Sequence, residues 1–120
     1  MKYKILVVDD AIFMRERIKK ILNGIDCETI EAKNGKEGCE LFQSTEPDLV
    51  LLDISMPVMN GIEALSQMIC INPNIPIVMC SAIGQESQIM NAIDLGAKDF
   101  IVKPFSEDYI IRTIQKFLDK

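Results

Sequence analysis

Five short apolar runs, separated by stretches with helical spacing, constrain the fold of this chain more than any other feature of its sequence. The runs at 5–8 and 49–52 are continuous and do not alternate with polar residues. Continuous runs of this kind are typical of strands that are covered on both faces, as in parallel sheets. The predicted strands span residues 3–8, 27–32, 48–52, 76–80 and 98–102.

The segments between these runs have the spacing of amphipathic helices. Gly96 is the expected end of the fourth helix, and Ser106 is the expected N-cap of the fifth. The second helix is the weakest prediction, because Gly38 lies in its middle and costs about 1 kcal/mol relative to alanine. In the first and third helices, the apolar residues with helical spacing are Met14, Ile18, Ile21, Leu22, Ile62, Leu65, Met68 and Ile69.

Five strands alternating with five helices predict a doubly wound α/β fold with right-handed crossovers. We expect one domain over residues 1–120, with a flavodoxin-like (βα)5 arrangement and a parallel sheet of strand order 2-1-3-4-5. In such a sheet the functional site lies beyond the carboxyl ends of the strands, near the switch point between strands 1 and 3.

Composition and charge exclude several classes of function. The net charge is −5, so we expect no binding of nucleic acid through this domain. No apolar run approaches the ~18–20 residues that span a bilayer, and the start has no signal-peptide pattern. We therefore expect a cytoplasmic protein without membrane insertion. Histidine is absent, which excludes Ser-His-Asp catalysis, and the four cysteines are interpreted as reduced core or near-core thiols.

Polar residues with complementary chemistry stand at the ends of four predicted strands. Asp9 and Asp10 follow the first strand, Asp53 the third, Ser81 the fourth and Lys103 the fifth. One polar residue after a strand is usually just the start of a loop. Five at the same edge of a parallel sheet indicate a shared site.

The chemistry of this cluster favours a metal ion and a phosphoryl group. Two carboxylates about 5 Å apart repel each other by roughly 3 kcal/mol at an effective dielectric constant near 20. Oxygen ligands favour Mg²⁺, with Mn²⁺ as an alternative, over zinc, and Mg²⁺ commonly also binds a phosphate oxygen. Asp53 is the candidate nucleophile for an acyl phosphate, with Lys103 and the Ser81 hydroxyl holding the phosphoryl oxygens.

Four motifs, "VVDD" (7–10), "LLDISMPVMNG" (51–61), "CSA" (80–82) and "VKPF" (102–105), occur in an order and spacing that resemble the receiver domain of two-component response regulators. The resemblance covers the whole chain. It implies that Asp53 is the phospho-acceptor. It further implies that Asp10, Asp53 and the backbone carbonyl of Ser55 bind Mg²⁺ directly, while Asp9 acts mainly through water.

The same resemblance assigns roles to residues of the fourth and fifth strands. Ser81 stands where the family has Ser or Thr, and Lys103 stands at the family's lysine. Phe100 occupies the position of the switch aromatic, although an ordinary core aromatic would also fit a strand centre. The family pattern implies a cis peptide bond between Lys103 and Pro104.

The implied mechanism begins with a phosphohistidine on a sensor histidine kinase, which donates its phosphoryl group to Asp53. The phosphate draws Ser81 inward, and Phe100 turns into the vacated space. This repacks a partner face formed by the fourth helix, fifth strand and fifth helix, including Ile89 and Phe100. The protein is then no enzyme in the usual sense, since it catalyses only its own phosphorylation and dephosphorylation, with a phosphatase as a further partner.

The local wording "DDAIFMR" (9–15), "CSAIGQ" (80–85) and "GAKDFIVKPF" (96–105) resembles single-domain chemotaxis regulators, which implies the flagellar motor switch protein as partner. An isolated receiver domain of a transcription regulator or a phosphorelay protein is the alternative. One departure concerns charge, because residues 37–97 contain no Lys or Arg. A haloacid dehalogenase-type phosphohydrolase and a flavodoxin-like electron carrier are remote alternatives, since "DDAIFMR" fits neither pattern after the first strand.

Overall fold

Strands and helices alternate along residues 2–118, which are the residues that the computed structural model describes. The strands are β1 (Tyr3–Val8), β2 (Cys27–Ala32), β3 (Leu49–Asp53), β4 (Ile77–Ser81) and β5 (Asp99–Val102). The helices are α1 (Ile12–Gly24), α2 (Gly35–Thr45), α3 (Gly61–Ile71), α4 (Glu86–Leu95) and α5 (Glu107–Leu118).

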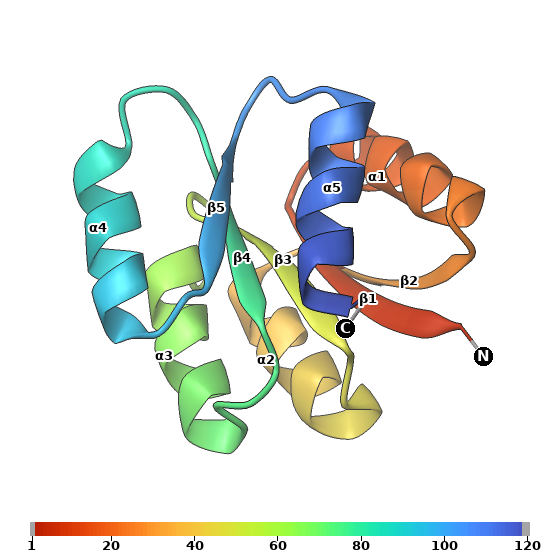
Figure 1. Cartoon of the computed structure of the whole chain (residues 1–120). Helices are drawn as coiled ribbons and strands as arrows, with labels where there is room; N and C mark the ends of the chain where they lie inside the picture. The colour runs from red at the N-terminus through yellow and green to blue at the C-terminus, as the bar shows by residue number, and fades with distance from the viewer. Residues whose placement is uncertain (1, 119–120) are drawn as a thin grey trace.

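The strands form one parallel sheet of order β2-β1-β3-β4-β5 with helices on both faces (Figure 1). Helices α1 and α5 cover one face, and α2, α3 and α4 cover the other. The predicted fold class and strand order are therefore confirmed. The switch point lies between β1 and β3, where consecutive crossovers pass to opposite sides of the sheet.

Each face of the sheet has its own apolar core, because continuous apolar strands present side chains to both sides. On the α1 and α5 side, Ile5 and Leu51 pack with Ile18 and Ile114. On the other side, the buried residues include Leu6, Leu52, Phe42, Leu65 and Met68. This double burial holds the strand ends in fixed positions, and these strand ends carry the candidate site residues.

Strands β3 and β4 are shifted by one residue relative to the prediction. They begin after Asp48 and Pro76 and end at Asp53 and Ser81, so these two residues belong to the strands and do not merely follow them. Asp53 pairs with Cys80 in the ladder, and Ser81 pairs with Val102. Ladder pairing therefore fixes the backbone of both polar residues.

The predicted helix boundaries hold at α4 and α5. Gly96 lies at the C-cap of α4 with a φ of 123°, a conformation that favours glycine. The Ser106 hydroxyl accepts a hydrogen bond of 3.1 Å from the backbone N–H of Tyr109, as an N-cap does. Gly38 has a packing reason within α2, since a Cβ atom there would lie only 3.0 Å from Val8 of β1.

The interpretation of the cysteines is correct for three of the four. Cys27, Cys39 and Cys80 are buried, whereas Cys70 is exposed on α3. Burial raises the pKa of Cys80 to about 12, so this thiol next to the strand end stays protonated.

Among residues 2–118, no helix has both the length and the apolar composition needed to cross a bilayer.

Candidate functional site

Three carboxylates gather at the carboxyl edge of the sheet. Asp9 follows β1, Asp10 comes next, and Asp53 ends β3, which pairs with β1. One oxygen from each carboxylate lies within 4.8 Å of the others. Asp9 and Asp53 are buried, whereas Asp10 is exposed. The predicted convergence of these acids is thus present in the structure.

Lys103 reaches this acidic cluster from the loop after β5. Its Nζ atom lies 3.0 Å from Oδ2 of Asp9 and 3.1 Å from Oδ1 of Asp53. Burial alone would lower the pKa of Lys103, but the carboxylates of Asp53 and Asp9 raise it above its ordinary value. The lysine is therefore a fixed cation between the two buried acids, and the peptide bond that follows it, to Pro104, is cis as predicted.

The environment of Asp53 raises the pKa of its carboxyl group. Burial raises its pKa from an ordinary value of 3.8 to about 6, and the like charges of Asp9 and Asp10 add to the rise. Lys103 acts in the opposite direction and limits the shift. At neutral pH the carboxylate is still mostly ionised, as a nucleophile must be.

Gly61 at the start of α3 lies directly against the backbone of Asp53. A Cβ atom on Gly61 would overlap the Asp53 carbonyl oxygen and crowd the Cα atom of Ile54. The backbone N–H of Gly61 donates a hydrogen bond of 2.7 Å to the carbonyl oxygen of Ile54, and Asn60 and Glu63 form a capping box at the same turn. The β3–α3 loop is therefore folded back tightly over the strand end.

Arg15 of α1 holds the backbone of Asp9 in place, and the sequence alone did not identify this role. Its Nη1 atom donates a hydrogen bond of 2.6 Å to the backbone oxygen of Asp9, and its Nε atom donates one of 3.1 Å to Glu31. The side chain is only 13% exposed. Arg15 ends the segment "DDAIFMR" (9–15), but the segment does not indicate which groups the side chain contacts, so only the fold shows this role.

Ser81 brings a hydroxyl to the same edge. Its side chain is fully buried, and within residues 2–118 its Oγ atom has no hydrogen-bond partner. The backbone oxygen of Ser81 accepts a hydrogen bond of 2.8 Å from the N–H of Lys103, which ties the two strand ends together. Burying a hydroxyl without a hydrogen-bond partner is costly, and among the described residues Ser81 shares this property only with Thr29.

Ser55 lies in the loop after β3 and is exposed. Its hydroxyl accepts a hydrogen bond of 2.7 Å from Nε2 of Gln85, which comes from the loop before α4. The sequence reading assigned a role to the backbone carbonyl of Ser55 but none to Gln85. Gln85 ends the segment "CSAIGQ" (80–85), but the segment alone does not indicate which groups this side chain contacts.

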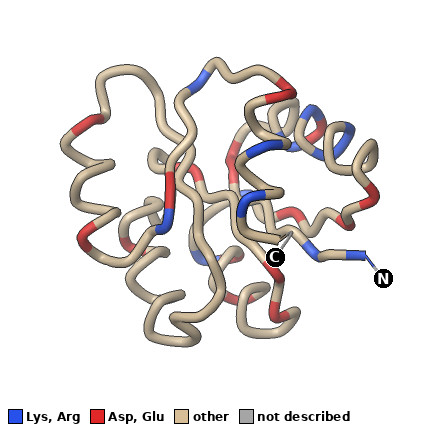
Figure 2. Tube along the Cα trace, viewed as in Figure 1, with Lys and Arg blue, Asp and Glu red and all other residues tan. Residues whose placement is uncertain are grey.

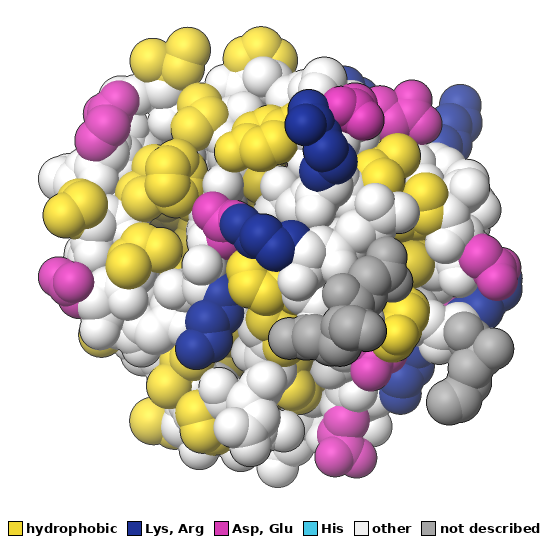
Figure 3. All heavy atoms as spheres, viewed as in Figure 1, with side chains coloured by type: hydrophobic (Ala, Val, Ile, Leu, Met, Phe, Trp, Pro, Cys, Tyr) yellow, Lys and Arg dark blue, Asp and Glu magenta, His cyan; other side chains and the backbone are white. Residues whose placement is uncertain are grey.

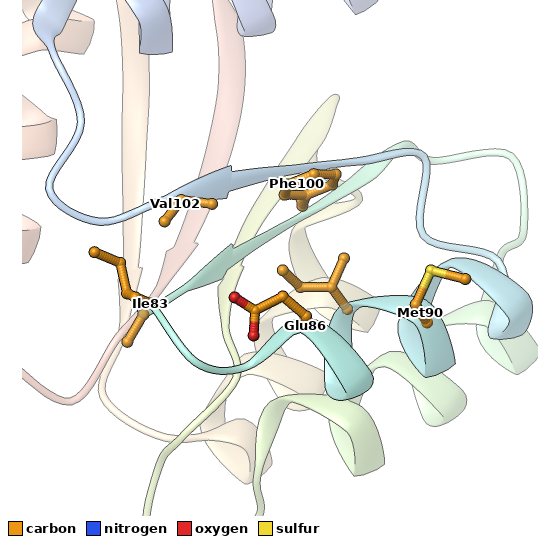
Figure 4. A pocket seen from close by; sticks show the side chains of 7 residues that line it. Ile83, Glu86, Met90, Phe100 and Val102 are labelled. Atoms are coloured by element: carbon orange, nitrogen blue, oxygen red, sulfur yellow. The ribbon is translucent and has the colours of Figure 1, made fainter.

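Phe100 and Ile89 lie apart from the acidic cluster, at an apolar groove between α4 and β5. The groove has a volume of about 260 Å³, and Figure 4 shows side chains from both elements around it. Phe100 is 36% exposed, so it is no ordinary core aromatic, while Ile89 is buried at 8% and forms part of the groove lining. Figure 3 shows apolar side chains gathered on the left of the view, where Figure 1 places α4 and β5. The other lining residues are Ala82, Ile83, Glu86, Met90 and Val102.

Charge is unevenly distributed around this groove, since α4 on one side carries no basic residue and β5 on the other has basic neighbours. Residues 37–97, which include α3 and α4, contain no Lys or Arg, and Figure 2 shows only acidic residues along α4. Basic residues lie on α1, on α5 and around β5. A partner of the groove therefore meets apolar side chains, with acidic residues on the α4 side and both acidic and basic residues around β5.

The family model described as "Response regulator receiver domain" matches residues 5–115. The chain belongs to this family. The receiver domain predicted from the four motifs is thus confirmed.

Receiver domains with known names resemble the chain over most of its length. It is 49% identical to "Chemotaxis protein CheY" of Bacillus subtilis, over 99% of this chain and 100% of that protein. It is 47% identical to the protein of the same name in Listeria monocytogenes, over 94% of this chain and 96% of that one. Its structure matches NtrX of Brucella abortus with a TM-score of 0.93 and 33% identity, over 99% of this chain but only 27% of that longer one.

The residues of this receiver domain fit a hard divalent cation. Carboxylate oxygens from Asp9, Asp10 and Asp53 lie within 4.8 Å of one another, and all three are oxygen donors of the kind that Mg²⁺ prefers. Receiver domains generally bind Mg²⁺ through such an acidic pocket. Lys103 offsets only part of the negative charge, so a cation would also relieve the remaining repulsion.

Proposed function

We propose that this receiver domain is a phospho-acceptor switch in which a sensor histidine kinase phosphorylates Asp53. The observation that carries the proposal is the grouping of three carboxylates, one lysine and one unpartnered hydroxyl at one edge of the sheet. These groups match the needs of phosphoryl transfer, which depends on positioning and on stabilising negative charge.

The transfer exchanges one bond for another. An Asp53 carboxylate oxygen forms a bond with phosphorus while the phosphorus–nitrogen bond to the kinase histidine breaks. The electron pair of the broken bond leaves with the imidazole, which then takes up a proton. Lys103 already contacts Asp53 at 3.1 Å and is placed to pair with a phosphoryl oxygen, and the buried Ser81 hydroxyl supplies a donor for another.

Asp10, Asp53 and the backbone carbonyl of Ser55 are the proposed direct ligands of Mg²⁺, with Mn²⁺ as a substitute. Asp9 is assigned an indirect role through water. The arrangement supports this division, because both carboxylate oxygens of Asp9 already accept hydrogen bonds, from Ala11 at 2.9 Å and from Lys103 at 3.0 Å. Asp10 is exposed and has room for an ion. The bound cation would supply positive charge that offsets the carboxylates and the phosphoryl oxygens.

The proposed output is a change in the groove between α4 and β5. Movement of Ser81 toward the phosphate makes space into which Phe100 turns, and the groove that Phe100 lines with Ile89 changes shape. The similarity to the chemotaxis proteins supports a role in chemotaxis, with the flagellar motor switch protein as the partner. The protein then works in the cytoplasm, a phosphatase resets it, and it acts as an enzyme only on its own Asp53.

A receiver domain of a transcription regulator or a phosphorelay protein is the second candidate. The close structural match to NtrX, whose chain is much longer, favours it. Determining whether the gene continues past Lys120, and with which domain, distinguishes this candidate from the first.

Two measurements test the proposal in sequence. Incubation with acetyl phosphate and Mg²⁺ should add one phosphoryl mass to the wild-type protein and to the control Asp94→Asn, which changes an exposed acid on α4, but not to Asp53→Asn. Equal modification of Asp53→Asn would falsify the assignment of the acceptor.

The second measurement concerns the partner. A flagellar-switch peptide should bind more tightly when Mg²⁺ and beryllofluoride, which mimics the aspartyl phosphate, are present. Unchanged affinity in the activated protein would favour the second candidate.

A further inference from the structure

Gln85 lies at the N-cap position of α4, yet its side chain does not cap the helix. A capping residue uses its side chain to accept a hydrogen bond from the second or third N–H of its own helix, and Ser, Thr, Asp and Asn are preferred for this. Gln85 points its side chain away from its helix. The position is therefore occupied by a residue whose side chain serves another contact.

The side-chain amide of Gln85 joins two loops at the mouth of the phosphorylation site. Its Oε1 atom accepts a hydrogen bond of 2.7 Å from the backbone N–H of Ala82. Its Nε2 atom donates a hydrogen bond of 2.7 Å to the hydroxyl of Ser55. Ala82 follows Ser81 directly, and Ser55 comes two residues after Asp53, so one side chain bridges the strand ends that carry the acceptor and the buried hydroxyl.

The N–H group that Gln85 occupies belongs to the residue that directly follows β4, the strand paired with β3. Asp53 pairs with Cys80 in the ladder, so the residues after Cys80 lie alongside the space beyond the Asp53 strand end. A phosphoryl group brings three oxygens into that space, and Lys103 is already shared with Asp9. The next donors along β4 are the Ser81 hydroxyl, which has no described partner, and the Ala82 N–H, whose acceptor is Gln85.

The loop that Gln85 holds is otherwise weakly fixed. Gly84 has a φ of 98° and would have no heavy atom within 4 Å of a Cβ, and Ile83 is 79% exposed. The only further hydrogen bond within the described loop from Gln85 to Ala82 is a long backbone contact of 3.3 Å. Releasing the Gln85 side chain would therefore free the loop to move.

The same loop forms one end of the apolar groove. Ala82, Ile83 and Glu86 line the groove with Phe100, and Gln85 stands between Ile83 and Glu86 in the chain. Figure 4 shows Ile83 and Glu86 on this segment, across from β5. A change at the Ala82 N–H would thus pass to the groove through adjacent residues of one short loop.

We propose that the Gln85 side chain is a latch that holds the β4–α4 loop in its unphosphorylated position, and that a phosphoryl group on Asp53 competes with Gln85 for the Ala82 N–H. The proposal rests on the proposed function of Asp53 as the acceptor. Gln85 is a positioning residue, since its hydrogen bonds go to Ala82 and Ser55 and it acts on the site through them.

The test compares the affinity for beryllofluoride, at fixed Mg²⁺, of the wild type, Gln85→Met and Gln88→Met. Methionine keeps the length of the side chain and suits a helix, but it makes neither amide hydrogen bond. Gln88 is an exposed glutamine one turn further along α4 and serves as the matched control. Because the chain contains no tryptophan, binding is followed by the amide NMR resonance of Ala82.

We expect Gln85→Met to bind beryllofluoride about fivefold more tightly, the equivalent of about 1 kcal/mol for one hydrogen bond that no longer competes. Gln88→Met should match the wild type. In the absence of beryllofluoride, the Ala82 amide of Gln85→Met should exchange with solvent faster than that of the wild type. A purely structural role of Gln85 would give weaker binding, not tighter binding.

Unchanged or weaker binding by Gln85→Met, with normal binding by the wild type, would overturn the latch and leave the acceptor role of Asp53 intact. If the wild type fails to bind beryllofluoride, or if Asp53→Asn binds it as tightly as the wild type, the proposed function itself fails, and the latch fails with it. As an internal check, Ser55→Ala removes the other end of the bridge while keeping the backbone carbonyl. Its effect should not add to that of Gln85→Met, because both variants break the same link.

Discussion

The backbone carbonyl oxygen of Asp53 occupies the position that a Cβ atom on Gly61 would need. The first turn of α3 can approach the end of β3 this closely only because residue 61 has no side chain. The φ of Gly61 is not in the left-handed region, so its backbone conformation does not require a glycine. The glycine of the "MNG" segment is required instead by its close contact with the backbone of the proposed phospho-acceptor.

Replacing Gly61 with alanine should lower the free energy of unfolding by about 2–4 kcal/mol, because backbone atoms must move to admit the methyl group. Urea unfolding measures this change. Gly24→Ala is the matched control, since a Cβ atom at Gly24 would have nothing within 4 Å. We expect Gly24→Ala to be neutral or stabilising by up to about 1 kcal/mol. Equal effects of the two variants would contradict the role given to the close approach.

Arg15 is expected to stabilise both the fold and the acidic site. Arg15→Ala removes the donors to the Asp9 carbonyl and to Glu31 and should lower the free energy of unfolding by about 2 kcal/mol. Arg112 provides the control, because its ion pair with Asp108 is more than 70% exposed on both sides and is worth at most about 0.5 kcal/mol. Thermal or urea unfolding of both alanine variants tests the difference, and a similar loss in each would show that the Arg15 contacts add little.

Much of the fold follows from local pattern. Short apolar runs predicted the strands to within one residue, two of them from continuous runs, and alternation with helical spacing indicated parallel crossovers. The site followed from the same logic, because parallel strands bring their carboxyl ends to one edge. Asp9, Asp10, Asp53, Ser81 and Lys103 could therefore be predicted before any contact was known.

Other features could not be predicted, because they depend on distances between segments that are remote in the sequence. Arg15, Gln85 and Gly61 act through contacts with backbone atoms or with one hydroxyl, and such contacts leave no periodic signal. Gly38 illustrates the same limit, since propensity shows only its cost to α2, whereas the structure shows Val8 pressed against it. Likewise Phe100 sits in a strand with core spacing, yet it is partly exposed at a groove.

The raised pKa of Asp53 predicts how stability depends on pH in the metal-free protein. Because its folded pKa is about 6 against an ordinary 3.8, the folded state binds more protons between these values than the unfolded state does. This carboxyl therefore contributes increasing stability as the pH falls from 7 toward 4, on the order of 2 kcal/mol. With EDTA present, wild type minus Asp53→Asn should show this slope in urea unfolding. A difference that does not vary with pH would contradict the assigned pKa.

Mg²⁺ should stabilise this receiver domain by relieving repulsion among its carboxylates. At pH 7.5, millimolar Mg²⁺ should raise the unfolding midpoint of the wild type, since a ligand that binds only the folded state stabilises it by mass action. Asp10→Asn removes one proposed ligand and should weaken Mg²⁺ binding by about tenfold or more, the order of one lost charge-assisted contact. Asp94→Asn makes the same charge change on exposed α4 and should keep wild-type affinity. Titration of the midpoint with Mg²⁺ decides the matter, and equal affinities for the two variants would remove Asp10 from the ligand set.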